Sequence, residues 1–249
     1  MTAVLLTFVF AAGVAARDSR KELTVDLKFA PQEGVQSNSP DLTPGLTEKS
    51  VAIKVEDKRP GDAAVIGQGT NDDDVSFPIK ASSSVAGFVH GTAKQVAENW
   101  GLKLDDAAER TLTLKLTRYF VDESNKAVGS VYAAEVGVTF VLADKSGKTL
   151  MEGATSGSAH RYGRARSADN CNEVLSDSLK ETLANILSDA RLQQAWTSGK
   201  ASSGTASASA SAPAESAEER LRKLDDLLKK GLITKEEYDK KRKEILADL

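Results

Sequence analysis

Residues 198–217 contain no large apolar side chain, so they divide the chain into a globular part before them and a short C-terminal part after them. A segment rich in serine and alanine cannot bury enough apolar surface to repay the entropy of ordering its backbone. We therefore predict a flexible tether whose root-mean-square reach is about 25 Å. The expected organisation is a signal peptide over residues 1–16, a globular domain over residues 17–197, the tether over 198–217, and a helical hairpin over 218–249.

The N-terminal sixteen residues are typical of a secretory signal peptide. They are uncharged and apolar, they end with Val14 and Ala16 in a V-x-A pattern, and charged residues follow from Arg17 onward. A helix of this length covers about 24 Å, less than the ~30 Å hydrocarbon core, which argues against a permanent membrane span. The alternative is an apolar first strand or a buried helix of the domain. Since no cysteine follows the apolar run, we expect a periplasmic or secreted protein without an acyl anchor.

Alternating apolar residues, the pattern of half-buried strands, recur along the globular part. The clearest runs lie at residues 22–31, 51–60, 111–122, 130–144 and 149–163. A Lys-Ser-Gly-Lys turn separates the last two runs, which predicts a hairpin and an antiparallel pairing. The stretch between the second and third runs contains residues 67–74, which we interpret as a polar connection.

Two other segments have apolar residues at helical spacing. Residues 82–100 end at Gly101, which suits the C-terminal stop of a helix, and residues 170–196 carry one continuous apolar stripe. The globular part is therefore predicted to have an α+β fold, with a mainly antiparallel sheet packed by two amphipathic helices.

Composition excludes some classes of function. The net charge of −3 lacks the basic excess with which proteins usually bind nucleic acid through its phosphates. His90 and His160 are the only histidines, and neither has a second histidine or cysteine at a ligand spacing, so we expect no zinc site and no cofactor. We interpret His90 as a packing or solvated residue and Cys171 as an inert thiol.

Several short motifs resemble functional sites in part. Residues 153–157 have the spacing of a nucleophile elbow but carry threonine in place of serine and lie in a strand pattern. Residues 71–74 are acidic but lack the spacing of a calcium loop. Asp57 and Arg59 lie on one side of a strand, where we expect them to pair or to cap a loop. None of these motifs predicts catalysis.

A basic cluster after the last predicted strand is the candidate anion-binding site of the domain. It consists of His160, Arg161, Arg164 and Arg166, which together could receive an anionic group. The alternative interpretation is a charged loop that follows a strand.

The C-terminal 32 residues carry the most consistent local signals in the chain. Gly231 suits the left-handed end of a first helix, and Thr234 with Glu237 forms a capping box that begins a second one. Ile233 and Tyr238 are spaced as a hydrophobic staple. A hairpin this small is marginal alone, so its apolar face is predicted to contact a protein surface, and the alternative is that it packs on its own globular domain. We expect the contact residues to be Leu221, Leu224, Leu227, Leu228, Leu232, Ile233, Tyr238, Ile245 and Leu246.

This hairpin resembles the SHOCT domain, a short C-terminal domain appended to many unrelated prokaryotic proteins. The matching core is Leu228, Gly231, Ile233, Thr234, Glu236, Glu237 and Tyr238. The resemblance implies an accessory role in oligomerisation or recruitment, without known chemistry. The balance of ten basic and nine acidic residues over residues 218–249 disfavours a membrane or nucleic-acid surface for the hairpin itself.

Residues 51–67 resemble the opening of the YajG-like family of bacterial envelope lipoproteins, in which a strand ending V-x-D-x-R precedes an I-G. The matching positions are Val55, Asp57, Arg59, Ile66 and Gly67. The resemblance extends over residues 20–196 in the order of the elements, and it implies an envelope accessory protein whose activity is uncharacterised. The chain departs from the family in lacking the acylated cysteine and in carrying the C-terminal extension.

Together these patterns predict a non-enzymatic accessory protein of the cell envelope. Its globular domain would bind an envelope partner, and its hairpin would self-associate or recruit a second protein, with no transmembrane span in the mature chain and no nucleic acid. The alternative is a periplasmic module that binds a small or anionic ligand.

Overall fold

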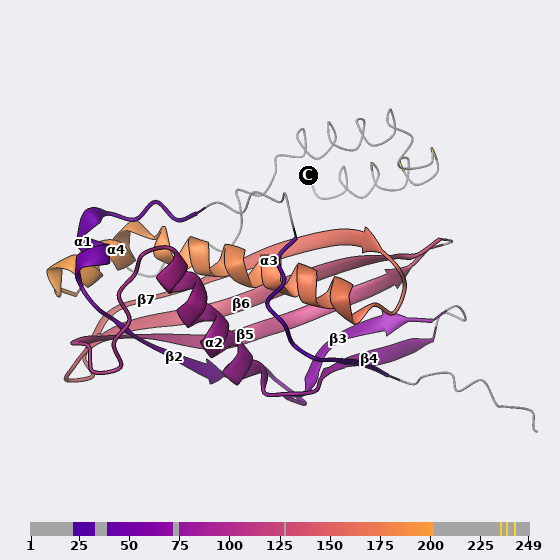
Figure 1. Cartoon of the computed structure of the whole chain (residues 1–249), viewed down its shortest axis with the longest axis horizontal. Helices are drawn as coiled ribbons and strands as arrows, with labels where there is room; N and C mark the ends of the chain where they lie inside the picture. Colours follow the sequence, from indigo (N-terminus) through magenta and orange to yellow (C-terminus); the bar gives the residue numbers. More distant parts are fainter. Residues whose placement is uncertain are drawn as a thin grey trace, which may run out of the picture.

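The computed structural model describes residues 22–32, 39–71, 75–126 and 128–201, together with Lys235, Tyr238 and Arg242. Over the globular part it is an α+β fold in which a seven-stranded mixed sheet packs against helices (Figure 1). The strands are β1 (Leu23–Val25), β2 (Ala52–Asp57), β3 (Val65–Thr70), β4 (Ser76–Ala81), β5 (Arg110–Asn125), β6 (Ser130–Asp144) and β7 (Thr149–Gly163). The helices are α1 (Pro44–Glu48), α2 (Val85–Asn99), α3 (Ala168–Leu187) and α4 (Ala190–Ser198).

The predicted signal peptide and nearly all of the tether and the hairpin lie outside the described residues. Lys235, Tyr238 and Arg242 are helical.

The three long strands β5, β6 and β7 form an antiparallel meander, which confirms the hairpin predicted for β6 and β7. Their apolar side chains fall in one phase, so Leu112 and Leu114 of β5 and Phe140 of β6 are buried on the face that the helices cover. The predicted turn between β6 and β7 is also present, and Gly147 adopts a left-handed φ of 84° within it.

The remaining strands make the sheet mixed. β2 and β3 pair in succession with the two halves of β5, both in parallel, whereas β3 and β4 form an antiparallel hairpin and β1 runs parallel to β4. The prediction of a polar connection over residues 67–74 was wrong, because β3 includes Gly67 and Gly69. A Cβ atom on Gly67 would lie 2.2 Å from the carbonyl oxygen of Val121, so only glycine permits this close strand pairing.

Helix α2 confirms the predicted first amphipathic helix. The Ser84 side chain caps it by accepting a hydrogen bond from the Gly87 amide at 3.2 Å, and Gly101 follows its end with a φ of 87°. Val85, Val89 and Val96 are buried on the face that packs against β2.

The second predicted helix was wrong in its extent, since it is two helices. Helix α3 ends at Leu187, and α4 begins after Asp189, whose carboxylate accepts a hydrogen bond from the Arg191 amide at 2.8 Å. The apolar stripe continues through the break to Leu192 and Trp196, both fully buried, which explains why periodicity alone suggested one helix.

The first predicted strand is shorter than expected because a helix takes over its backbone hydrogen bonds. β1 ends at Val25, and the chain then runs along the polar side of α3. The amides of Lys28, Ala30 and Gln32 donate to the side chains of Asn172, Ser176 and Asp177, at 3.1, 2.9 and 3.1 Å. Burial raises the pKa of the Asp177 carboxyl.

Helix α3 also protects the outer edge of β7. Glu181 accepts a hydrogen bond from the Ser158 amide, at 2.6 Å, and the Asn185 side chain donates to the Ser156 carbonyl, at 3.1 Å. The helix can lie this close because Gly157 has no side chain, since a Cβ there would be 2.4 Å from the Ser178 carbonyl oxygen. Two backbone groups that could pair with another strand are thus occupied.

Asp57 and Arg59 pair with each other and clamp the loop before β3, as expected. The Arg59 guanidinium donates to both carboxylate oxygens of Asp57, at 2.9 and 2.8 Å, and to the carbonyls of Ala63 and Val65. The Arg59 side chain is only 7% exposed. The hydrogen bond from Arg59 lowers the pKa of Asp57.

Candidate functional site

The candidate site lies at one end of the sheet. The β3–β4 turn, the β5–β6 turn and the C-terminal end of β7 all meet there, on the right in Figure 1. The register shows this directly, because Ser130 at the start of β6 pairs both with Asn125 at the end of β5 and with Gly163 at the end of β7. The loop that carries Arg164 and Arg166 follows β7 at the same end.

The four residues of the predicted basic cluster do not lie on one surface of the structure. His160 is exposed and lies next to Arg161 along β7, so the two side chains point to opposite faces of the sheet. Arg161 forms an ion pair with Glu173 of α3. Arg164 and Arg166 are exposed in the loop between β7 and α3. Only these last two lie on one loop, and anion binding by the cluster stays a prediction.

A buried carboxylate that the sequence analysis missed fixes this loop. Glu123 of β5 is 3% exposed, and its Oε1 accepts hydrogen bonds from the Arg166 amide at 2.6 Å and the Ser130 hydroxyl at 2.9 Å, and lies 3.0 Å from the Tyr132 hydroxyl. A carboxylate removed from water is costly unless such donors surround it. Its other oxygen, Oε2, has no hydrogen-bond partner in the part of the chain that the structure describes.

Tyr132 is the second anchor of the loop. Its hydroxyl lies 2.7 Å from the Arg164 carbonyl, to which it can donate, and it accepts a hydrogen bond from the Ser167 amide at 3.0 Å. The Asn170 side chain donates to the same Arg164 carbonyl, at 3.0 Å. Burial raises the pKa of the Tyr132 hydroxyl, so this group stays protonated and able to donate.

The loop backbone is held in a sparsely populated conformation at Arg166. Its φ of 52° is positive, which costs free energy in a residue other than glycine unless the surroundings enforce it. The bond from its amide to Glu123 provides that enforcement. The Arg166 guanidinium lies 5.0 Å from the ring centroid of Phe77, a cation–π contact that fixes the side chain over β4.

This arrangement can position a loop and present cationic side chains. The described metal-ligand, thiol and imidazole groups near the sheet have the following surroundings. In the described part of the chain, no set of three or more His, Cys, Asp or Glu side chains could hold a metal ion. Cys171 lies near Glu123, and burial raises the pKa of its thiol to about 12, so it is a poor nucleophile. His90 contacts the Ile53 carbonyl, at 3.1 Å, in the packing of α2 on β2.

Exposed apolar side chains share this end of the sheet. Val75 lies in the β3–β4 turn, Val128 lies in the β5–β6 turn, and Tyr162 lies near the end of β7; their exposures are 58%, 78% and 58%. Among the described residues these are the large hydrophobic side chains that remain exposed.

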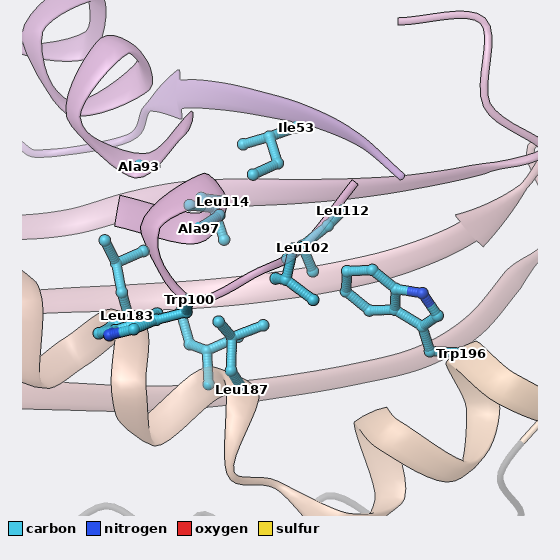
Figure 2. A pocket seen from close by; sticks show the side chains of 11 residues that line it. Ile53, Ala93, Ala97, Trp100, Leu102, Leu112, Leu114, Leu183, Leu187 and Trp196 are labelled. Atoms are coloured by element: carbon cyan, nitrogen blue, oxygen red, sulfur yellow. The ribbon is translucent and has the colours of Figure 1, made fainter. Parts of the chain in front are cut away.

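A hollow between α2, α3 and the sheet is too small for a ligand. Its lining is entirely apolar and includes Ile53, Trp100, Leu102, Leu187 and Trp196 (Figure 2), and its volume is ≈ 10 Å³. A cavity of that size has room for about one water molecule, which would find no polar partner there. The Trp196 N–H has no hydrogen-bond partner among the described residues, and Figure 2 shows its nitrogen on the side of the ring away from Leu102. The hollow is therefore a packing gap.

Residues 153–157 lie inside β7, as their strand pattern indicated. A Cβ on Gly153 would lie 2.6 Å from the Phe140 ring, so this glycine makes room for an aromatic side chain. Of the predicted hairpin contact residues only Tyr238 is described, and it lies in a helix. The other eight lie outside the described residues, and so do Asp72, Asp73 and Asp74.

Comparisons with known proteins identify two regions of the chain. A family model described as uncharacterized lipoprotein matches residues 38–196, and the model of the short C-terminal domain matches residues 219–246. No curated protein matches the chain significantly. Among the described helices, none combines the length and the apolar character that crossing a bilayer requires.

Several solved structures are similar to this chain. A protein of Xanthomonas campestris is 8% identical, with 72% of this chain and 99% of that chain covered and a TM-score of 0.46. PelC of Paraburkholderia phytofirmans, solved as a dodecamer, is 20% identical, with coverages of 63% and 94% and a TM-score of 0.31. A minor lipoprotein of Acinetobacter baumannii is 12% identical, with coverages of 61% and 92% and a TM-score of 0.29. Likenesses this weak carry no functional argument.

Proposed function

Because the chain belongs to the family described as uncharacterized lipoprotein and carries a short C-terminal domain, we propose that it is a non-enzymatic accessory protein of the cell envelope. Its α+β domain binds an envelope partner, and its C-terminal hairpin mediates oligomerisation or recruitment. The protein acts on the outer side of the cytoplasmic membrane, in the periplasm or beyond it.

The observation that supports this proposal is in the sequence: a leucine-striped segment that matches the short C-terminal domain over residues 219–246 follows a segment, residues 198–217, without large apolar side chains. A unit of about thirty residues has too small a core to be stable by itself, so covering its apolar face stabilises it. A tether of twenty residues lets the hairpin search a radius of about 25 Å around the end of α4. When one of two linked modules is bound, the tether raises the effective concentration of the other module at its own binding site.

The absence of an enzymatic role is part of the proposal, and the candidate site supports it. Its buried carboxylate accepts hydrogen bonds from the Arg166 amide and the Ser130 hydroxyl, lies within hydrogen-bond distance of the Tyr132 hydroxyl, and holds a loop in place. The cysteine beside it is buried, with a raised pKa. A general acid or nucleophile would need access to a substrate.

Deletion of residues 218–249 tests the role of the hairpin. We expect the domain to stay folded while its mass by light scattering falls or a crosslinked partner is lost in cells. A sharper version replaces Leu224 and Leu228 with alanine, and the matched control replaces the neighbouring Asp225 and Lys229. Unchanged mass and unchanged crosslinks in both the deletion and the leucine variant would refute the proposal.

A second function, binding of an anionic ligand, is favoured by the loop between β7 and α3. Arg164 and Arg166 are exposed on a backbone that Glu123 and Tyr132 hold in place. Inorganic phosphate should then raise the Tm of the protein, and Arg164→Glu should abolish that rise while Lys148→Glu, in the distant β6–β7 turn, leaves it unchanged. Equal behaviour of the two variants would remove support for this function.

A further inference from the structure

The exposed apolar side chains form one group because of the strand register. Thr70 pairs with Ser76 across the β3–β4 turn that carries Val75, and Asn125 pairs with Ser130 across the turn that carries Val128. β3 runs parallel to β5, and Gly69 lies opposite Glu123, so both turns are at the same end of the sheet. Neighbouring strands lie about 4.8 Å apart, so a width of about 20 Å includes every strand from β4 to β7.

The Tyr162 side chain lies against the β5–β6 turn. A Cβ atom on Gly129 would lie 3.0 Å from the hydroxyl of Tyr162, so the tyrosine covers the β5–β6 turn beside Val128. The apolar groups stand on turns at the end of a sheet and do not line a groove. Such a surface fits a broad, soft apolar layer better than it fits a single peptide.

Two cationic side chains lie at the same end of the sheet. Lys126 is exposed in the β5–β6 turn, and Arg164 is exposed in the loop after β7. Lysine and arginine bind phosphate groups, and tyrosine is favoured where a hydrocarbon layer meets polar head groups. Asp72, Asp73 and Asp74 stand beside Val75 in the sequence, so the surface need not prefer anionic lipid.

The direction of β1 shows from which end of the sheet the chain enters it. β1 runs parallel to β4, with Leu23 opposite Ile79, and β4 begins at Ser76 at the same end as the turns. The chain therefore enters β1 from that end. Five residues lie between Ala16, the end of the apolar run, and Glu22, and the six Cα–Cα steps can span at most about 20 Å.

We propose that this end of the sheet docks on the lipid surface of an envelope membrane, with Val75, Val128 and Tyr162 in the interfacial layer and Lys126 and Arg164 against lipid phosphates. The proposal rests on the envelope location proposed above and names the partner of the α+β domain. The sheet then stands on the membrane, with the β6–β7 turn pointing away from it. β6 has 15 residues, so the two ends lie about 46 Å apart.

Site-specific fluorescence on the full chain tests this orientation. Val128→Cys and Lys148→Cys place an environment-sensitive dye at the two ends of the sheet. Native Cys171 is buried, and its raised pKa keeps it out of the labelling reaction at neutral pH. With phosphatidylcholine vesicles the dye at position 128 should shift to shorter wavelength and be quenched by brominated acyl chains, while the dye at position 148 keeps its aqueous emission.

Matched variants separate the contributions of the surface. In the Val128→Cys background, Val75→Ser with Tyr162→Ser should remove the shift, and Lys145→Ser at the opposite end should not. Arg164→Gln with Lys126→Gln should weaken the response to vesicles that contain phosphatidylglycerol more than the response to phosphatidylcholine alone. The N-terminal segment is common to all variants, so differences between them report the sheet end.

Three results would overturn the proposal. The dye at position 128 could keep its aqueous emission with both vesicle types, or both dyes could shift equally. A shift that needs no lipid and grows with protein concentration would show that a second copy covers this end. The hairpin-deletion experiment uses neither vesicles nor a dye. Failure of the membrane-docking proposal and failure of the proposed function are therefore distinguishable.

Discussion

Tyr132→Phe is the sharpest test of how the loop between β7 and α3 is held. The substitution removes one oxygen atom and keeps the ring, which is fully buried. That oxygen lies 2.7 Å from the Arg164 carbonyl and 3.0 Å from Oε1 of Glu123, and it accepts the Ser167 amide at 3.0 Å. The substitution therefore removes one donated hydrogen bond, which the Arg164 carbonyl or Glu123 can accept, and the acceptor of the Ser167 amide.

The expected cost follows from what each group retains. The Arg164 carbonyl keeps the Asn170 side chain, and Glu123 keeps the Arg166 amide and Ser130, so losing the donated hydrogen bond costs about 1 kcal/mol. The buried Ser167 amide is left without an acceptor, which costs a further 1–3 kcal/mol, roughly. We expect the free energy of unfolding to fall by about 2–4 kcal/mol.

Urea unfolding followed by the fluorescence of buried Trp196 measures this change. With an m-value of about 2 kcal/mol/M, the midpoint should move by roughly 1–2 M. Tyr162→Phe is the matched control, because the Tyr162 side chain is exposed and loss of its hydroxyl should change the free energy of unfolding by less than about 0.5 kcal/mol. If the two variants lose the same stability, the buried hydroxyl does not hold the loop, and this account of the site fails.

Further predictions concern packing, charge and thiol chemistry. Gly157→Ala should lower the free energy of unfolding by about 1–3 kcal/mol, because its Cβ would lie against the backbone of α3, whereas Gly91→Ala in open space on α2 should raise it by about 0.5–1 kcal/mol in the same urea titration. Arg59→Gln should cost about 2–3 kcal/mol, since it strips a nearly buried ion pair and two carbonyl contacts. The pKa of Asp57 is lowered in the folded state, so the stability that this carboxylate contributes is present above the ordinary carboxyl pKa and is lost as the pH falls through the lowered value. Acid titration of the wild-type protein should show this loss of stability, and the Arg59→Gln variant should show less of it. The Cys171 thiol, with a pKa of about 12, should react with a thiol reagent at pH 8 only after unfolding, and rapid reaction of the folded chain would contradict its burial. The unfolded thiol ionises first, so this group should also lower stability as the pH rises from about 9 toward 12.

The sequence predicted those parts of the fold whose periodicity is carried by side chains. The strands β5, β6 and β7 and the helix α2 were found because each buries one continuous apolar face. β3 was missed because Gly67 and Gly69 leave no alternation to detect, and their role depends on Val121 and Phe77, far away in the sequence. The break at Asp189 was missed because the apolar stripe resumes beyond it.

The candidate site was predicted only in part, for a related reason. His160, Arg161, Arg164 and Arg166 look like one cluster in sequence, but strand alternation directs Arg161 toward Glu173 and away from His160. Glu123 left a detectable signal, since it continues the buried phase of β5 after Tyr119 and Val121, where a lone charge needs partners. Its partners Tyr132 and Arg166 come from other elements, and their meeting depends on the register of the sheet.

The two side chains that α3 lays against the rim of β7 restrict how copies of this domain can grow into larger assemblies. An incoming strand would have to displace Glu181 and Asn185 before it could extend the sheet past Ser156 and Ser158. Fibre-like growth from that rim is therefore suppressed by two polar residues on a helix. Natural variation at these two positions should consequently be judged by solubility as much as by stability, because losing either one would uncover a template for aggregation.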